Sequence, residues 1–230
     1  TPLYPAIPET LDFQRNNFAC VPYLEGRGYV TYAYNISAGS VVRWCRDALA
    51  YHLKEDGRSV YAVLNETAPT QPTSLMVLPF LQGMGGTPDV DPNATGLIAG
   101  LTTQTRLPDL YRAILEGVTF EMRYNMEKLS EGNVSINRLL ACGGGARSPV
   151  WLQIKADILG CEIIPVQQEE TGAMGSAILG LSAVLGESPI KLAEGFWRYA
   201  QPVRPNPEHQ AIYHQRYQLY KQLRAFYKEI

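Results

Sequence analysis

The spacing of apolar residues predicts three long helices. In the first, apolar residues step by four and form one buried face, and Pro108 suits the first turn; the residues are Leu110, Ile114, Val118, Met122 and Met126. Near the end of the chain, aromatic residues recur at helical spacing with Arg224 and other cations between them, which predicts an amphipathic, solvated helix that carries His209 and His214. Residues 172–185 are apolar and dotted with small residues, so we predict a core helix packed closely against a neighbouring backbone.

Alternating and continuous apolar runs predict strands between these helices. Residues 29–35 alternate as a half-buried strand and lead into a helix that Ser37 or Ser40 can cap. A second strand is predicted at 74–81, after a loop at 65–73 that contains two prolines. Strands that alternate with helices indicate an α/β fold with a mixed or parallel sheet flanked by helices.

The most distinctive segment is a strand, a glycine turn and a helix in direct succession. The apolar strand 138–142 runs into the turn, Ser148 is a good N-cap for the helix, Gly160 ends it, and a strand follows at 162–166. The turn consists of Gly143, Gly144, Gly145 and Ala146. Such a turn lets a ligand touch the backbone, and the N–H groups and dipole of the Ser148 helix favour an anionic or polar ligand. A nucleotide is therefore the natural ligand for such a turn.

Two other interpretations of the glycines stay open at this point. They can simply make a tight turn. Alternatively, Gly143, Gly145 and Ser148 approximate the dinucleotide pattern G-x-G-x-x-G, with Glu169 or Glu170 past the next strand, as in an NAD-dependent oxidoreductase. A Walker A loop is excluded, because G-x-x-x-x-G-K-[ST] does not occur in the sequence.

Two aspartates lie in a segment rich in glycine and proline, residues 82–96, which we predict to be a shaped loop. Asp89 and Asp91 form a candidate carboxylate pair. An Asp before Pro92 more often starts a turn, and we favour that interpretation.

Composition narrows the classes of partner. Twenty Lys and Arg against 22 Asp and Glu leave a formal net charge of -2, which favours neither nucleic acid nor an anionic membrane as a partner. No apolar stretch reaches the roughly 18 residues of a membrane span.

The four cysteines are scattered, so neither a disulfide framework nor structural zinc is predicted, and a reducing cytoplasm fits best. The three histidines belong to no H-E-x-x-H sequence and lie beside no candidate nucleophile, which gives hydrolytic chemistry little basis.

The stretch ACGGGARSPVWLQIKADILGCEIIPV, followed by EETGAMGSAILG, resembles the nucleotide-binding end of FGGY carbohydrate kinases. Upstream, LPFLQGMGGTPDVDPNATGLIAGLT and LYRAILEGVTFEMRYNMEKL are similar to that family's loop, strand and long helix, most of all in its xylulokinase-like members. The resemblance covers nearly all of residues 29–185. It implies an actin- and hexokinase-like (ribonuclease H-like) ATPase fold. Residues 29–230 would be the C-terminal, nucleotide-binding domain of a two-lobed kinase, and residues 1–28 an irregular lead-in after a missing N-terminal lobe.

The resemblance also assigns roles to residues. Residues 143–146 would contact the α-phosphate and ribose side of ATP or ADP, Ser148 would border the adenine, and Gly172 and Gly175 would let the next helix pack beneath the pocket. The family's catalytic Asp and its Gly-Thr phosphate turn find no counterpart in residues 1–28. We therefore expect no catalytic residue in this chain and no activity from the chain alone.

For the full-length protein, the resemblance implies transfer of the γ-phosphoryl group of ATP to a hydroxyl of a ketopentose or related sugar. Mg²⁺ would arrive with ATP, and the N-terminal lobe would bind most of the sugar. Gly86, Thr87 and Pro88 stand where the family commonly has Arg-Thr-Pro, so the sugar stays open, as does a homodimer. The alternative outside enzymes is an ATP-sensing domain without a catalytic lobe.

Overall fold

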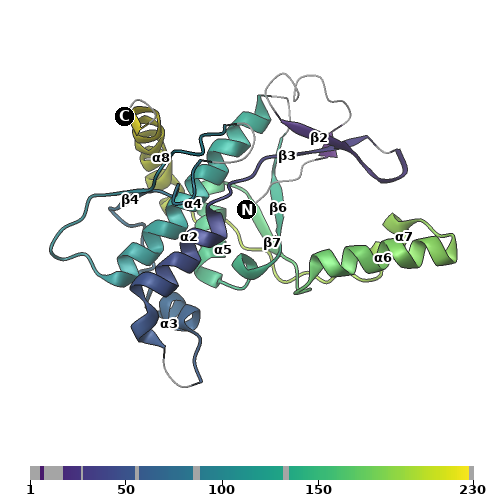
Figure 1. Cartoon of the computed structure of the whole chain (residues 1–230), viewed down its shortest axis with the longest axis horizontal. Helices are drawn as coiled ribbons and strands as arrows, with labels where there is room; N and C mark the ends of the chain where they lie inside the picture. The colour runs from purple at the N-terminus through teal and green to yellow at the C-terminus, as the bar shows by residue number, and fades with distance from the viewer. Residues whose placement is uncertain are drawn as a thin grey trace.

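The computed structural model describes residues 6–7, 18–26, 28–54, 57–84, 89–131 and 135–227. A body of packed helices carries small sheets and a projecting helical arm (Figure 1). The longer helices are α4 (Leu107–Ser130), α5 (Pro149–Leu159), α6 (Thr171–Leu185) and α8 (Pro207–Tyr227). The shorter ones are α2 (Ala38–Trp44), which continues as a π-helical turn over Cys45–Leu49, α3 (Val60–Thr67) and α7 (Pro189–Glu194).

Three small sheets accompany the helices in the described part of the chain, where one mixed sheet was expected. The antiparallel sheets are β1 (Ala6–Ile7), β3 (Tyr29–Tyr32) and β2 (Ala19–Pro22), in that order, and the pair β4 (Met76–Leu78) and β5 (Leu97–Ala99). The parallel pair is β6 (Arg138–Ala141) and β7 (Glu162–Pro165), in register from Arg138 opposite Glu162 to Ala141 opposite Pro165.

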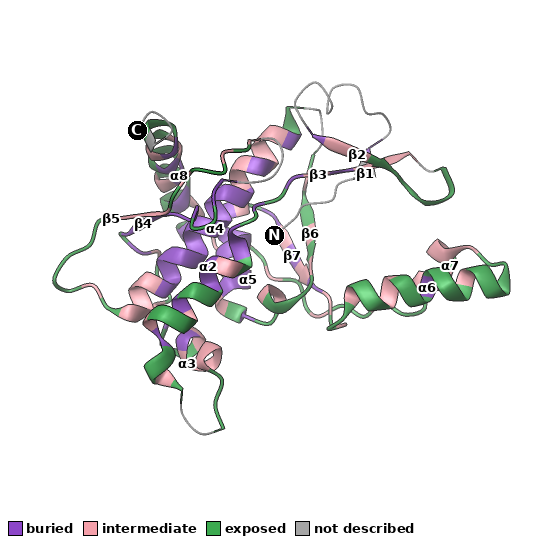
Figure 2. Ribbon diagram, in the orientation of Figure 1, coloured by how far each residue is buried: buried purple, intermediate pink, exposed green. Residues whose placement is uncertain are grey.

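Helix α4 is the centre of the core, as the four-residue spacing predicts. It packs against α5 and β4, and most of its residues are buried, so it is coloured purple along much of its length in Figure 2. Gly117 permits its close approach to β4, because a Cβ atom there would lie 2.5 Å from the carbonyl oxygen of Val77. Through α5, this helix supports the glycine turn.

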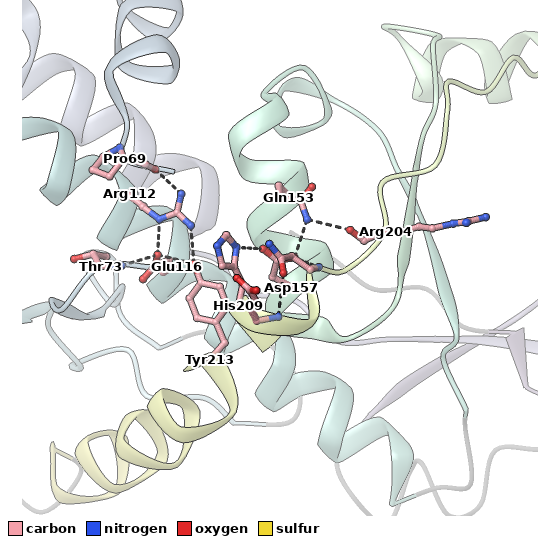
Figure 3. Close-up of polar contacts among 11 residues, drawn as sticks. Pro69, Thr73, Arg112, Glu116, Gln153, Asp157, Arg204, His209 and Tyr213 are labelled. Atoms are coloured by element: carbon pink, nitrogen blue, oxygen red, sulfur yellow. Dashed lines mark hydrogen bonds and ion pairs between the residues drawn. The ribbon is translucent and has the colours of Figure 1, made fainter. Parts of the chain in front are cut away.

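Buried polar groups fix α8 to α4 and α5 (Figure 3). Glu116 Oε1 accepts hydrogen bonds from Arg112 Nε at 2.8 Å and from the Tyr213 hydroxyl at 2.7 Å. Burial raises the pKa of Glu116, and the hydrogen bond from Tyr213 and the charge of Arg112 oppose that rise. His209 lies 2.9 Å from Asp157 Oδ2 of α5. His209 is buried because the first turn of α8 faces α5. The prediction that His209 lies on a solvated helix is therefore wrong.

A second buried network corrects the prediction that Arg224 lies on the polar face of α8. Its guanidinium donates to both carboxylate oxygens of Glu121, at 3.0 and 3.1 Å, and to Asp89 at 3.0 Å. Asp91 instead accepts a hydrogen bond from the backbone N–H of Asn93 at 3.0 Å, which confirms the predicted turn. Asp89 and Asp91 therefore accept from different donors, Arg224 and the Asn93 amide.

Helix α6 forms where the sequence predicts it, but its prediction as a core helix is wrong. It extends away from the helical body with α7 beside it, and most of its surface is exposed (Figures 1 and 2). Ile178 is its only buried residue among those described, while Val184 is 83% exposed. The apolar pattern encodes a face suited to burial, but it does not encode which element covers that face.

Other local differences have identifiable causes. Helix α3 occupies part of the loop predicted at 65–73; its single buried residue, Leu64, gives a weak helical pattern beside the two prolines. Ser37 takes the N-cap position of α2, but its hydroxyl bonds to Gly83 O and Gln82 N instead of capping the helix. Short strands β1 and β2 lie within residues 1–28, the expected irregular lead-in, whose boundary as a domain stays a prediction.

Candidate functional site

The candidate site begins where β6 ends at the glycine loop, residues 143–147. Gly143 has φ +75° and ψ -170°, a conformation that residues with a Cβ atom rarely adopt. The loop then makes a tight 3₁₀ turn, in which Ala146 N–H donates to Gly143 O at 3.0 Å and Arg147 N–H to Gly144 O at 3.2 Å. The strand, glycine turn and helix predicted from the sequence are thus confirmed.

Ser148 connects the glycine loop to α5 and to α3. Its hydroxyl oxygen accepts a hydrogen bond from Trp151 N–H at 3.2 Å, as an N-cap does, and its O–H donates to Asn65 Oδ1 at 2.7 Å. Tyr111 of α4 donates to the same Asn65 oxygen at 3.0 Å. The buried Ser148 side chain therefore supports the start of the helix, and Asn65, which sequence reasoning missed, holds Ser148 in place.

Trp151 forms the floor beneath the loop. A Cβ atom on Gly145 would lie 2.9 Å from Trp151 Cζ3, which is closer than real Cβ atoms come. Trp151 is buried, and its indole N–H donates to the Thr119 hydroxyl of α4 at 3.1 Å, so the ring has little freedom to move aside. Close packing against Trp151 thus requires glycine at position 145. The sequence alone does not distinguish this glycine from Gly143 and Gly144.

Lys155, one turn further along α5, lies beneath the same loop. Its Nζ donates to the carbonyl oxygen of Gly145 at 3.3 Å and lies 4.2 Å from the centroid of the Trp151 ring. The residue is 5% exposed. Burial lowers the pKa of Lys155 to about 8, and the thiol of Cys142 acts in the opposite direction. The sequence predicts only that Lys155 lies on α5.

A partly open hollow of about 240 Å³ lies between the loop and the segment that follows β7. Gly143, Ala146 and Arg147 line one side, and residues 165–169 with Ala200 line the other. Arg147 and Glu169 form an exposed ion pair at 3.0 Å. Gln168 is held by hydrogen bonds to Phe196 O and from Arg198 N–H. The hollow is smaller than the roughly 300–1,000 Å³ of complete small-molecule pockets, so it suits part of a larger ligand.

The arrangement fits an anionic ligand that lies along the backbone. Within the described residues, a Cβ direction from Gly143 or Gly144 meets nothing within 4 Å, so the outer surface of the turn is open. The N-terminus of the eleven-residue helix α5 adds its positive dipole end next to that surface. Ribose and a phosphate can therefore approach residues 143–146, with the hollow beside them for a further group.

The predicted site residues take different positions in the structure. Gly143, Gly144 and Ala146 lie together at the open surface, Gly145 faces Trp151, and the Ser148 side chain points to Asn65. Gly172 and Gly175 lie on the projecting α6, where a Cβ atom would meet nothing within 4 Å in the described structure. They therefore do not permit close packing beneath the pocket in this chain.

The described residues show neither a metal cluster nor a membrane-spanning helix. In that part of the chain no group of three or more His, Cys, Asp and Glu side chains is placed to hold a metal ion. A membrane-spanning helix is also absent from it, since none of its helices is long and apolar enough. Gly86, Thr87 and Pro88, where the sequence departs from the family's usual loop, lie outside the described residues.

Comparison with known proteins gives one family. Residues 12–184 match the model of the C-terminal domain of the FGGY family of carbohydrate kinases. The chain is 31% identical over 169 residues to a xylulose kinase from Bacillus subtilis, an alignment that covers 72% of this chain and 33% of that protein. It is 31% identical over 216 residues to a ribulokinase from Geobacillus thermodenitrificans, covering 87% of this chain and 38% of that protein.

A solved structure agrees with these relatives. The crystal structure of a protein from Brucella ovis described as a xyloylose kinase superposes with a TM-score of 0.82 at 27% identity, over 96% of this chain and 45% of that one. The chain thus spans between a third and two fifths of the length of the two curated relatives above. All three proteins are kinases, so the dinucleotide and ATP-sensing alternatives gain no support from them.

Proposed function

This chain belongs to the FGGY family of carbohydrate kinases, and we propose that it is the nucleotide-binding lobe of a kinase that phosphorylates a ketopentose or related sugar. Its fold is the actin- and hexokinase-like one of that family. Residues 29–230 would form the C-terminal domain, with residues 1–28 leading into it. The chain supplies the surface that holds the nucleotide, and ATP supplies the phosphoryl group.

The glycine loop carries this proposal. Its outer surface is open at Gly143 and Gly144, it starts at the end of a parallel strand, and a capped helix follows it. Backbone N–H groups and a helix N-terminus are the donors that phosphate and ribose oxygens prefer. In this proposal residues 143–146 contact the phosphate and ribose side of the nucleotide, and the first turn after Ser148 borders the adenine.

The relatives support the proposed class of sugar. One is a xylulose kinase and another a ribulokinase, and both sugars are ketopentoses. A hydroxyl of such a sugar would accept the γ-phosphoryl group, with Mg²⁺ bound together with ATP. We propose that the catalytic Asp lies outside these 230 residues, because residues 1–28 hold no counterpart to it, and we expect no turnover by this chain alone. Four cysteines without a disulfide fit our placement of the protein in the cytoplasm.

The exposed α6 supports the role of a lobe. Its uncharged surface would contact another part of a longer kinase, since the curated relatives are about three times as long as the region that matches. A free lobe would hold nucleotide weakly, with a dissociation constant of about 1 mM, which corresponds to a binding free energy of about 4 kcal/mol.

Saturation-transfer NMR with ADP and, separately, NAD tests the class of ligand. We expect saturation of the adenine protons of ADP and no saturation of the nicotinamide protons of NAD. Saturated nicotinamide protons would instead support a dinucleotide site and contradict the proposal. A Gly144→Leu variant, which fills the open surface of the loop, is the matched control and should lose the ADP signal.

A further inference from the structure

Burial of the Lys155 ammonium is energetically unfavourable, and the packing of the fold does not account for it. A buried charge is unfavourable unless it is paired, and no carboxylate is paired with Lys155 in the described structure. Its neighbours are the Gly145 carbonyl and the face of Trp151. A methionine would fill the same volume on α5 without this cost, so packing does not require an amine.

The position of the ammonium gives it two effects on the loop. A hydrogen bond from a charged donor to a carbonyl is stronger than a neutral one, so it fixes the orientation of the peptide group between Gly145 and Ala146. That peptide lies in the tight turn whose outer surface is open. The charge lies at the Gly145 carbonyl of that turn, in a buried site where its field is weakly screened.

We propose that Lys155 is a positioning residue of the glycine loop: it holds the loop in its ligand-binding shape through the Gly145 carbonyl, and its charge strengthens the binding of a nucleotide phosphate on the other side. The inference rests on the proposed function, because it assigns the loop to a nucleotide. The positive charge is present at neutral pH and is lost as pH rises through about 8.

Other titratable groups near α5 are engaged elsewhere. Cys142, at the end of β6, is the one group that acts electrostatically on Lys155. Several groups around α5 have their own partners: Arg147 with Glu169, Arg123 with the Ile158 carbonyl, His209 with Asp157, and Arg204 with Glu162. Glu116 and Glu121 of α4 accept hydrogen bonds from Tyr213 and Tyr220 of α8. Because Cys142 acts electrostatically on Lys155, a Cys142→Ser variant tests whether a pH effect on the loop belongs to Lys155 itself.

The first experiment measures the loop without ligand. Amide hydrogen exchange at Ala146 and Arg147, whose N–H groups close the turn, reports whether the turn is formed. At pH 7.5 we expect these amides to exchange about 10-fold faster in Lys155→Met than in wild type. Lys155→Arg should restore much of the protection. Lys191→Met, at an exposed lysine on α7, is the matched control and should exchange like wild type.

The second experiment measures ADP affinity for the same variants by titration of ¹⁵N-labelled chain. Wild type should bind ADP about 10-fold more tightly than Lys155→Met at pH 7.5. The affinity of wild type and of Cys142→Ser should fall between pH 7.5 and 9.5, whereas that of Lys155→Met should not change.

The outcomes separate this inference from the proposed function. Unchanged exchange at Ala146 and Arg147 in a folded Lys155→Met chain would overturn the positioning role, whatever the ADP result. Equal ADP affinity of wild type and Lys155→Met would overturn the role of the charge. If the loop loosens as expected but wild type binds no ADP at any pH, Lys155 still positions the loop, while the nucleotide function and the effect of the charge on it both fail.

Discussion

Gly144 and Gly145 are adjacent in sequence but differ in what they are needed for. Gly145 lies against the buried Trp151 ring, whereas Gly144 meets nothing within 4 Å in the described structure. The first is required by the fold, and the second leaves room for a ligand. A motif search treats the two glycines alike, because only the packing on Trp151 distinguishes them.

Alanine at each position separates these roles. Gly145→Ala should lower the free energy of unfolding by about 1–3 kcal/mol, because the added Cβ meets a ring that cannot yield. Gly144→Ala should change it by less than about 0.5 kcal/mol, since the position is open. Urea denaturation of both variants checks the prediction, and equal losses of stability would contradict it.

The pKa of Lys155 makes stability depend on pH. Burial lowers this pKa from 10.5 in the unfolded chain to about 8, so between those values the unfolded chain holds more protons than the folded one. The contribution of Lys155 to stability therefore rises with pH through this window and is lost as pH falls towards 8.

The free energy of unfolding of wild type relative to Lys155→Met should accordingly increase by on the order of 2–3 kcal/mol between pH 7.5 and 10.5. The comparison is repeated in the Cys142→Ser background, which removes the group that acts electrostatically on Lys155. Urea denaturation across this range is the measurement, and a constant difference would show that Lys155 titrates normally in the folded chain.

At the scale of elements, the sequence predicts most of the segments and fewer of their surroundings. Helices α4, α5 and α8 and strands β3, β6 and β7 follow from apolar periodicity and capping residues, which are local signals. Helix α3 and strands β1, β2 and β5 are short and give weak local patterns. The burial of His209 and the exposure of α6 depend on which elements meet, and that information is not in a local pattern.

Gly117 shows how one contact positions an element. Gly117→Ala should lower the free energy of unfolding by about 2–3 kcal/mol, because its Cβ would lie 2.5 Å from Val77 O, and this clash exceeds the gain in helix propensity of about 1 kcal/mol. Gly39→Ala is the matched control: Gly39 is also helical, is exposed and meets nothing within 4 Å among the described residues, so it should stabilise α2. Chemical denaturation of both variants decides; a stabilising Gly117→Ala would mean that α4 and β4 are further apart than the structure shows.

At the scale of the whole molecule, the chain has a well-packed body and an uncovered arm. The core includes α4, α5 and α8, whereas α6 carries no charged residue and exposes Leu179, Leu181, Val184 and Leu185. Such a surface is typical of a face that another part of a protein covers. This is consistent with a lobe of a longer kinase, and a second copy of the chain is the competing occupant.

A lysine introduced on α6 tests which of its faces is exposed and which is buried. Val184→Lys should change the free energy of unfolding by less than about 0.5 kcal/mol, whereas Ile178→Lys, at the buried position, should cost at least about 2 kcal/mol. Val184→Lys should also reduce the binding of a hydrophobic dye. Denaturation and dye fluorescence check this, and a large loss of stability in Val184→Lys would show that α6 is covered within the chain itself.

The central claim is that the glycine loop binds the nucleotide, and an ADP titration followed by ¹H–¹⁵N NMR tests it most directly. We predict that the amide signals of Gly143, Gly144, Ala146 and Arg147 shift with increasing ADP, with smaller shifts along residues 165–169 and none in α7. Saturable shifts that map to α8 or to β4 and β5, with residues 143–147 unchanged, would contradict the account.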